Sequence, residues 1–327
     1  MIGGSGFIGS YLAHYLKDTQ KNIEFEIFDK NIESEYPYLT RQVDVRDIGR
    51  LRNSLRNNSI IINLAAEHKD NIQQKSLYYD VNVQGAKNVC KVASEKKIRT
   101  IIFTSSVAVY GFSEKTLDED SPLLPYHDYG KSKLLAERVY SKWQLEDRKK
   151  RTLIIIRPTV VFGAKNRGNV YNLMNIISKG HFIMIGSGEN LKSIAYVKNL
   201  VSFIIYSLRN KPGIHVFNYV DKPDFTMNSF VAFIRVNLKK QSKFIFRIPY
   251  FFGILTGYFF DFLALILRKN LAISSIRIKK FCANSSFNTS AFQSGFKPPF
   301  SIKSGLKDTI KYEFLKKNKS KKIFYGE

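Results

Sequence analysis

The sequence predicts an α/β protein built on a parallel sheet that is covered by helices on both faces. Three observations support this prediction: a glycine-rich turn at residues 3–9, apolar strand-like segments that alternate with helical ones, and polar side chains where those segments end. Such alternation is typical of doubly wound sheets, which bind ligands at the carboxyl ends of their strands. A chain of 327 residues, 44% of them hydrophobic, can bury one large domain and an appended lobe.

The first element is the glycine-rich turn, with glycines at positions 3, 6 and 9. Its G-x-x-G-x-x-G spacing is related to the dinucleotide fingerprint, in which bare backbone lets a pyrophosphate approach the start of a helix. A glycine triplet alone is as often an ordinary loop. Residues 23–29, however, read as a strand that ends in a carboxylate, at the distance where such folds hold an adenosine ribose. The two signals together predict a dinucleotide site at Gly3, Gly6, Phe7, Ile8, Gly9 and Asp29.

The strand before this turn is unusually short. A fingerprint of this kind should follow a buried strand of about five or six residues, yet only Met1 and Ile2 precede Gly3. We therefore expect either that the first strand is truncated or that the true start lies upstream of Met1, and we favour the second.

Two more strands are expected before residue 70. Residues 39–43 lead to Asp44 and Val45, which could contact an adenine ring; a helix N-cap is an equally good interpretation of Asp44. The β-branched segment 59–64 runs into small residues, which let a cofactor lie close. These strand ends complete the predicted cofactor site with Asp44, Val45, Leu64, Ala65 and Ala66.

The next helix and strand, residues 76–94 and 99–104, lead to hydroxyl side chains that include Ser106. A further helix then runs to about residue 143. Tyr129 and Lys133 fall on one face of it because they are four residues apart.

A Tyr-x-x-x-Lys pair is weak evidence by itself, and Tyr312 and Lys316 repeat it at what we interpret as the surface. The order of fingerprint, acidic residue, strand-end serine and helical pair is far more specific. It makes Tyr129, Lys133 and Ser106 the predicted catalytic residues, with Lys133 also in the cofactor site.

With these motifs in this order, the chain resembles the extended short-chain dehydrogenases/reductases, a family of NAD-dependent epimerases and dehydratases, over almost its whole length. The resemblance implies a Rossmann-like sheet and a bound NAD that oxidises a sugar hydroxyl. Tyr129 would be the base, because the charge of Lys133 brings a phenol of pKa about 10 towards neutrality, and Ser106 would hold the hydroxyl. Asp29 favours NAD because a carboxylate repels the 2′-phosphate of NADP, although Lys30 has the opposite effect.

The residues after Ser106 narrow the reaction. In the dehydratases of this family an Asp and a Glu follow the serine or threonine and serve the elimination of water. Val107 and Ala108 stand in those places here and cannot carry protons. The resemblance therefore implies epimerisation, an isomerase reaction in which NAD is reused.

The resemblance also divides the chain into two parts. Residues 1–163 are predicted to form the NAD-binding domain, to which residues 196–220 return. Residues 164–195 and 221–327 are predicted to form a smaller substrate lobe.

Residues 248–267 are twenty mostly apolar residues with one charge. As a helix this run would be about 30 Å long, enough to cross a hydrocarbon core. Asp261 argues against a span, since a carboxylate there costs about 2.5–3.5 kcal/mol on insertion scales. The flanking Arg247 and residues 268–269 suit a helix in the membrane interface. Three interpretations stay open: a core helix of the lobe, an exposed membrane-contact segment, and a span.

Basic residues of the lobe could bind a diphosphate. Soluble UDP-sugar epimerases carry an arginine where this chain has Lys192 and then Ser193, which weakens the case for a UDP-sugar but keeps a cation. The strip 274–282 reads equally as a half-exposed strand or as a diphosphate clamp. The predicted diphosphate ligands are Lys192, Arg277 and Lys279 or Lys280.

The formal net charge of +25 and pI near 9.8 indicate an anionic partner, although a lysine-rich solvated surface explains part of it. Basic residues are spread along the chain without a recognisable module, so no nucleic-acid partner is predicted. The lysine-rich residues 316–322 are predicted to be solvated or to bind anionic lipid.

Cys90 and Cys282 lack metal-ligand spacing, which argues for a reducing compartment and against a metal or disulfide. No signal peptide precedes the fingerprint, so we expect a cytoplasmic protein, or one bound to a membrane from that side.

Four segments resemble more narrowly the bacterial subfamily of N-acetylglucosaminyl-diphospho-undecaprenol 4-epimerases: residues 64–68, 166–173, 219–224 and 277–282. That subfamily makes the N-acetylgalactosaminyl lipid for O-antigen, a part of lipopolysaccharide. The resemblance implies a lipid-linked sugar substrate, contact with the cytoplasmic face of the inner membrane, and a homodimer through the helices at 76–94 and 129–143. Two alternatives stay open: a soluble UDP-N-acetylglucosamine 4-epimerase, and a catalytically silent NAD-binding regulatory scaffold.

Overall fold

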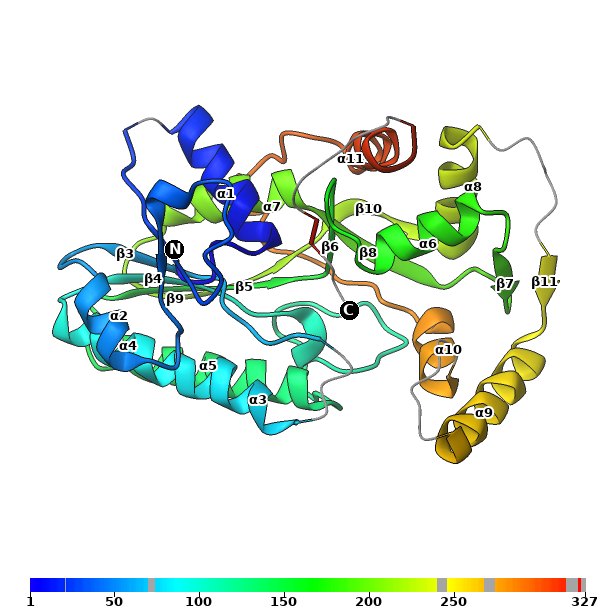
Figure 1. Cartoon of the computed structure of the whole chain (residues 1–327), viewed down its shortest axis with the longest axis horizontal. Coiled ribbons are helices and arrows are strands. Elements are labelled where there is room, and N and C mark those ends of the chain that lie inside the picture. Colours follow the sequence, from blue (N-terminus) through cyan, green and yellow to red (C-terminus); the bar gives the residue numbers. More distant parts are fainter. Residues whose placement is uncertain (21, 70–73, 240–245, 268–273, 316–322, 325–327) are drawn as a thin grey trace.

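The protein consists of a parallel sheet flanked by helices and a smaller region beside it (Figure 1). The structure is a computed structural model. It describes residues 1–20, 22–69, 74–239, 246–267, 274–315 and 323–324. The predicted basic segments at 268–269 and 316–322 lie outside the described residues.

The larger sheet is parallel throughout its described strands, as predicted. These are β1 (Ile27–Asp29), β2 (Thr40–Gln42), β3 (Ile60–Asn63), β4 (Thr100–Thr104), β5 (Thr152–Pro158) and β9 (Gly213–Tyr219). Strands β3, β4, β5 and β9 pair in that order, and β1 pairs with β2. Ile2 joins the two groups because it pairs with Phe28 of β1 and Asn63 of β3. The spatial order is therefore that of a doubly wound sheet.

The first two residues take the place of the central strand. The Ile2 N–H donates to the Ile62 carbonyl at 2.9 Å, and the Phe28 N–H donates to the Met1 carbonyl at 2.8 Å. The terminal amine of Met1 is buried and donates to the Glu26 carbonyl at 2.6 Å. Burial lowers the pKa of this amine to about 5. Met1 and Ile2 thus lie in the central row of this sheet, between β1 and β3.

Helices cover both faces of the sheet, with α1 and α7 on one side and α4 and α5 on the other (Figure 1). The helices of this region are α1 (Phe7–Thr19), α2 (Ile48–Ser54), α3 (Ser76–Tyr78), α4 (Gly85–Glu95), α5 (Asp128–Leu145) and α7 (Val197–Tyr206). A π-helical segment, Tyr79–Gln84, joins α3 to α4, so the helix predicted at 76–94 contains one widened turn. Short 3-10 turns lie at Pro37–Leu39, Val107–Val109 and Ser207–Arg209.

The smaller region holds two short sheets and the remaining helices. Its elements are β6 (Val160–Phe162), α6 (Asn169–Ser178), β7 (Ile183–Ile185), β8 (Leu191–Tyr196), β10 (Asp221–Thr226), α8 (Met227–Asn237), β11 (Phe246–Ile248), α9 (Tyr250–Leu267), α10 (Ser275–Cys282), α11 (Ile302–Ile310) and a π-helical turn at Lys311–Leu315. Strand β8 lies between β6 and β10, and β7 pairs with β11. Strand β6 thus pairs with the smaller region although it falls within residues 1–163; the two-domain division stays a prediction.

The interpretation of residues 274–282 as a half-exposed strand is wrong, because this segment is helix α10. The Ser274 hydroxyl caps the helix by accepting the Arg277 N–H. The alternation of Ile276 and Ile278 with polar residues was too short to separate period two from a helical turn.

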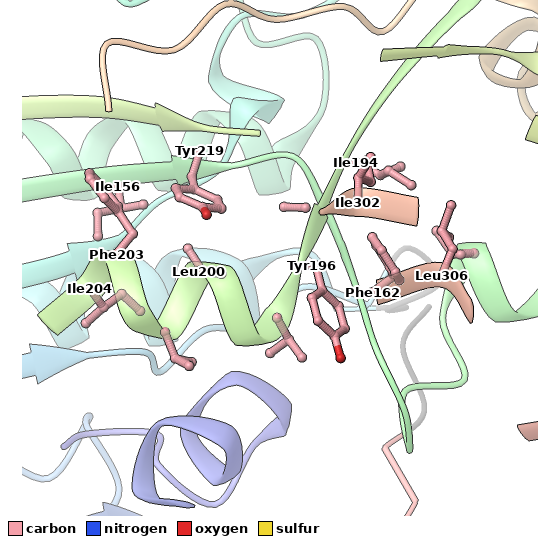
Figure 2. Close-up of a cluster of buried hydrophobic side chains, with 14 of the residues drawn as sticks. Ile156, Phe162, Ile194, Tyr196, Leu200, Phe203, Ile204, Tyr219, Ile302 and Leu306 are labelled. Atoms are coloured by element: carbon pink, nitrogen blue, oxygen red, sulfur yellow. The ribbon is translucent and has the colours of Figure 1, made fainter. Parts of the chain in front are cut away.

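A continuous apolar core joins the sheet to the smaller region. In Figure 2, Leu200 and Phe203 of α7 lie beside Ile156 and Tyr219 of the sheet. The rings of Phe203 and Tyr219 have centroids 5.2 Å apart. The same core takes in Ile302 and Leu306 of α11. This core fixes the carboxyl edge of the sheet, where the predicted site lies.

Candidate active site

The glycine turn brings the first predicted cofactor residues together. Gly3 has φ +74°, and a Cβ there would lie 2.4 Å from the Ala65 amide nitrogen, so the turn packs directly on the end of β3. The Ser5 N–H donates to the Asp29 Oδ2 at 2.9 Å, which places the predicted ribose ligand beside the turn. Gly6 is exposed and caps α1 without a side chain. The N–H groups at the start of α1, beside Phe7 and Ile8, thus receive no side-chain cap from Gly6, which is an arrangement that suits a bound pyrophosphate.

The alternative interpretation of Asp44 as a helix N-cap is wrong, because Asp47 caps α2 by accepting the Arg50 N–H at 3.0 Å. Asp44 instead accepts hydrogen bonds from Arg46, whose guanidinium lowers the pKa of the carboxyl. The Val45 side chain is buried, and a Cβ at Gly85 would lie 2.8 Å from it. A role of Asp44 and Val45 towards adenine stays a prediction.

The loop after β3 is held from both sides. The Leu64 N–H donates to the Ile2 carbonyl at 2.8 Å, and the Ala65 N–H donates to the Asn63 Oδ1 at 3.1 Å. Ala65 and Ala66 present only methyl groups there. The loop therefore lies next to the glycine turn with little side-chain bulk between them, and a role of Leu64, Ala65 and Ala66 towards a cofactor stays a prediction.

Helix α5 carries the predicted pair in its first two turns. His127 caps the helix, its Nδ1 accepting the Gly130 N–H at 2.9 Å, and Tyr129 follows at half-buried exposure. Lys133 lies one turn later, is 2% exposed, and donates through Nζ to the Thr104 carbonyl of β4 at 2.7 Å. Burial lowers the pKa of Lys133 to about 7, against an opposing effect of Glu137. Burial thus disfavours the charged form of Lys133, and the hydrogen bond to Thr104 fixes its Nζ at the carboxyl end of β4.

Ser106 lies at the carboxyl end of β4 and faces the start of α5. Its hydroxyl accepts the Ala108 N–H at 3.2 Å in the turn Val107–Val109. A Cβ at Gly130 would lie 2.4 Å from the Ala108 carbonyl oxygen, so only glycine lets α5 come this close to that turn. This close approach gathers the turn of Ser106 and the first turn of α5 at one edge of the sheet.

A buried polar network behind this site was not predicted from the sequence. Arg157 of β5 pairs with Glu137 of α5, with Nη2 and Oε2 2.7 Å apart, and both side chains are 5% exposed. The Ser105 hydroxyl donates to the same carboxylate, and the Arg157 guanidinium donates to the Tyr110 hydroxyl at 2.7 Å. An arginine at the end of an apolar strand was the one signal that could have indicated it. Because an unpaired charge would be costly here, the network fixes α5 against the sheet.

A second unpredicted residue is Asn82, in the π-helical segment. Its Oδ1 accepts the Glu67 N–H at 2.9 Å, and its Nδ2 donates to the Ser132 hydroxyl at 2.9 Å. The Ser132 hydroxyl in turn donates to the Tyr129 carbonyl at 2.8 Å. Asn82 therefore ties the loop after β3 to the turn of α5 that carries Tyr129.

The three predicted diphosphate ligands lie around α10. Lys192 of β8 is largely enclosed, and its Nζ donates to the carbonyls of Lys280 at 3.1 Å and Ala283 at 2.7 Å. Burial lowers the pKa of Lys192 to about 8. Arg277 and Lys279 are exposed, and the Lys279 ammonium lies over the Tyr258 ring at 5.3 Å. Lys192 thus holds α10 in place, and a role of the three residues towards a diphosphate stays a prediction.

The site fits a dinucleotide on two observations. The start of α1 is free of side-chain caps at Gly6, and a Cβ on Gly6 would meet only the Gly3 carbonyl oxygen, at 3.4 Å. The buried Thr104 hydroxyl, beside the carbonyl that receives Lys133, has no hydrogen-bond partner among the described residues. Bare backbone and an unused polar atom at one strand edge are what a cofactor with phosphate and ribose groups can use.

Sequence comparisons assign the chain to a family of enzymes. Residues 1–219 match the profile of the NAD dependent epimerase/dehydratase family. The chain is 45% identical over 329 residues to the N-acetyl-alpha-D-glucosaminyl-diphospho-ditrans,octacis-undecaprenol 4-epimerase of Escherichia coli O157:H7, covering 100% of this chain and 98% of that protein. It is 27% identical over 254 residues to the UDP-glucose 4-epimerase of Vibrio cholerae, covering 74% of this chain and 76% of that protein.

Solved structures share the fold at low identity. The UDP-glucose 4-epimerase of Thermotoga maritima, solved with UDP-glucose, has a TM-score of 0.73 at 17% identity and covers 95% of this chain and 96% of its own. The UDP-glucose 4-epimerase of Thermus thermophilus, solved with NAD, has a TM-score of 0.71 at 16% identity, covering 95% and 97%. Identities in this range show a common fold.

Proposed function

We propose that this chain, which belongs to the NAD dependent epimerase/dehydratase family, inverts carbon 4 of an N-acetylglucosamine carried on undecaprenyl diphosphate and so yields N-acetylgalactosamine. The observation that carries the proposal is the 45% identity, over the whole chain, to a 4-epimerase named for that substrate. The enzyme is an NAD-dependent isomerase.

The residues around α5 support this chemistry. Bound NAD supplies a reversible acceptor for the hydride at the sugar carbon, and the glycine turn with Asp29 would hold it. Tyr129 would take the proton of the sugar hydroxyl and return it after the transient 4-keto sugar has presented its other face. Lys133 would lower the pKa of the Tyr129 phenol, and Ser106 would hold the hydroxyl by a hydrogen bond.

Epimerisation fits the site better than dehydration. The turn after Ser106 presents Val107 and Ala108, and neither side chain can donate or accept the proton that the elimination of water requires. A keto sugar formed there has no nearby acid from this turn, so hydride return is the step that remains.

The partners follow from the substrate. A lipid-linked sugar is reached at a membrane surface, and we place the protein at the cytoplasmic face of the bacterial inner membrane, in O-antigen and lipopolysaccharide synthesis. We also propose a homodimer through the helices at 76–94 and 129–143. Both proposals rest on the resemblance to the lipid-linked 4-epimerases.

Turnover tests separate the candidates. Purified protein is incubated with N-acetylglucosaminyl-diphospho-undecaprenol and, separately, with UDP-N-acetylglucosamine, and the released sugars are identified. We expect turnover of the lipid-linked substrate, and turnover of the UDP-sugar alone would contradict the proposal.

Tyr129→Phe tests the role of the phenol. We expect kcat to fall by about 10²–10⁴ because the proton acceptor is lost, while NAD binding, measured by calorimetry, is retained. Tyr312→Phe is the matched control, since it also removes a phenol hydroxyl, from the tyrosine of the other Tyr-x-x-x-Lys pair. A Tyr129→Phe protein that keeps the cellular phenotype would support the silent scaffold instead.

A further inference from the structure

Helix α9 presents an apolar face to solvent. Large side chains recur along it every three or four residues and are between 44% and 76% exposed. We call this the aromatic face of α9; its central members are Phe251, Phe252, Phe259, Phe262, Leu265 and Ile266. Contiguous exposed apolar side chains of this extent mark an interaction surface.

The opposite side of α9 is fastened to the protein. A Cβ on Gly253 would lie 2.5 Å from Ile185, and a Cβ on Gly257 would lie 2.7 Å from the Cα of Ser275, so both glycines allow close packing. One turn further, the Asp261 carboxylate accepts the Ser275 N–H at 3.2 and 3.3 Å and so adds a second side-chain cap to the start of α10, beside Ser274. The charge in the middle of the apolar run therefore faces the protein.

This attachment argues against a span. By length and composition α9 could cross a membrane, and 11% of it is buried in the described structure. The contacts of its buried side are what argue against a span. To cross, the helix would have to give up the packing of Gly253 and Gly257 and carry Asp261 into lipid. Lying along a surface keeps those contacts and covers the aromatic face.

Cations stand beside the aromatic face. Lys279 of α10 lies over the Tyr258 ring, and Arg277 is exposed on the same helix. Arg247 of β11 is exposed as well, but its guanidinium donates to the carbonyls of Gly186 and Ser187 and to Asn228. In Figure 1, α9 and α10 lie together at one end of the molecule, away from the larger sheet. An apolar face bordered by cations is complementary to the interface of an anionic bilayer, where acyl chains lie beneath negative headgroups.

We propose that the α9–α10 hairpin docks the protein onto an anionic lipid bilayer, with the aromatic face of α9 in the interfacial layer and Arg277 and Lys279 at headgroup level. The assignment deepens the proposed function and rests on it for the lipid-linked substrate. Lys192 links the end of α10 to β8, so docking would orient the smaller region relative to the membrane.

Vesicle sedimentation tests the proposal with the full-length protein. The probes are vesicles of phosphatidylethanolamine with phosphatidylglycerol, and vesicles of phosphatidylcholine alone. We expect the unchanged protein to bind the anionic vesicles. The triple variant Phe251→Ser, Phe259→Ser, Phe262→Ser should lose about a hundredfold or more in partitioning to them. Arg277→Gln and Lys279→Gln should each reduce that partitioning about fivefold. A triple variant at exposed apolar positions elsewhere, Tyr38→Ser, Leu124→Ser, Val236→Ser, should bind like the unchanged protein.

Three results would overturn the proposal: no binding of the unchanged protein to anionic vesicles, equal binding of the α9 triple variant, or equal binding to phosphatidylcholine. Dissociation of a dimer by the triple variant, seen by analytical ultracentrifugation with vesicle binding unchanged, would assign the face to a second copy of the chain. Circular dichroism confirms that each variant is folded. Tyr129→Phe should bind vesicles like the unchanged protein, so a failure of docking and a failure of the epimerase function remain distinguishable.

Discussion

Helices α7 and α9 are both rich in apolar residues, but α7 is mostly buried and α9 is mostly exposed. Seven of the ten residues of α7 are buried, and Phe203 contacts aromatic rings of the sheet and of the segment before α11. Only Gly253 and Gly257 are buried among the eighteen residues of α9. Apolar content therefore indicates for both segments a helix whose side chains pack against an apolar surface. It does not indicate whether that surface belongs to the same protein.

The elements that precede and follow each helix in the chain explain why α7 is buried and α9 is exposed. Helix α7 ends the long connection between the parallel neighbours β5 and β9 of the larger sheet, and that connection has to cross a face of the sheet. Helix α9 lies between the short edge strand β11 and the small helix α10, which offer one narrow seam. The core-helix interpretation of residues 248–267 is wrong, because only two of the eighteen residues of α9 are buried.

The largest expected difference between the two helices is in the cost of removing a phenyl ring. Phe203→Ala should destabilise the protein by about 3–5 kcal/mol because the ring leaves a cavity in the core. Phe259→Ala, on the exposed face, should change the free energy of unfolding by less than about 0.5 kcal/mol. Denaturant unfolding of both variants measures this, and equal losses would contradict the contrast.

A buried carboxylate at the start of α7 makes the free energy of unfolding depend on pH. Asp221 accepts the Tyr196 N–H and the Asn199 amide at the start of α7, and burial raises the pKa of its carboxyl to about 6. The native protein holds this proton more tightly than the unfolded chain, so the stability it contributes is present below about pH 4 and is lost as the pH rises to about 6. Asp221→Asn should remove about 3 kcal/mol of that pH-dependent change. Unfolding curves at several pH values test it, and an undiminished change in the variant would refute the assignment.

Close packing at the seam of α9 predicts a moderate effect. Gly257→Ala should destabilise the protein by about 1–3 kcal/mol, because the added Cβ meets the backbone of Ser275. Thr256→Ala, on the exposed side of the same turn, is the matched control and should be within about 0.5 kcal/mol of the unchanged protein. Chemical denaturation distinguishes the two; a neutral Gly257→Ala would show that α9 does not depend on this seam.

The smallest expected effect concerns the cap of α10. Asp261→Ala should cost about 1 kcal/mol, the usual loss when a helix start loses its side-chain acceptor. Asp261→Asn keeps an oxygen that can accept the Ser275 N–H and should cost less. The ranking of these two variants in thermal unfolding is the test, and the reverse order would contradict the capping role.

Local patterns predicted the main sheet and the neighbourhood of the site. Apolar segments ending in polar residues indicated β1, β2, β3 and β4 to within a few residues, and the four-residue spacing placed Tyr129 and Lys133 on one face of α5. The sequence did not indicate that Lys133 would be buried against Thr104, or that Glu137 and Arg157 would pair behind it. Those contacts join residues 20 to 29 positions apart on different elements, and no local period reports such a pairing.

The sequence by itself determined the fold class, the glycine turn, the common helical face of Tyr129 and Lys133, and the family resemblance, because each depends on the spacing of residues near one another in the chain. Tertiary structure alone decided which apolar helix is buried and which is exposed, that residues 274–282 form a helix, and that Asp261 faces the protein. These outcomes depend on what packs against each segment, and residues at distant positions in the chain supply those surfaces.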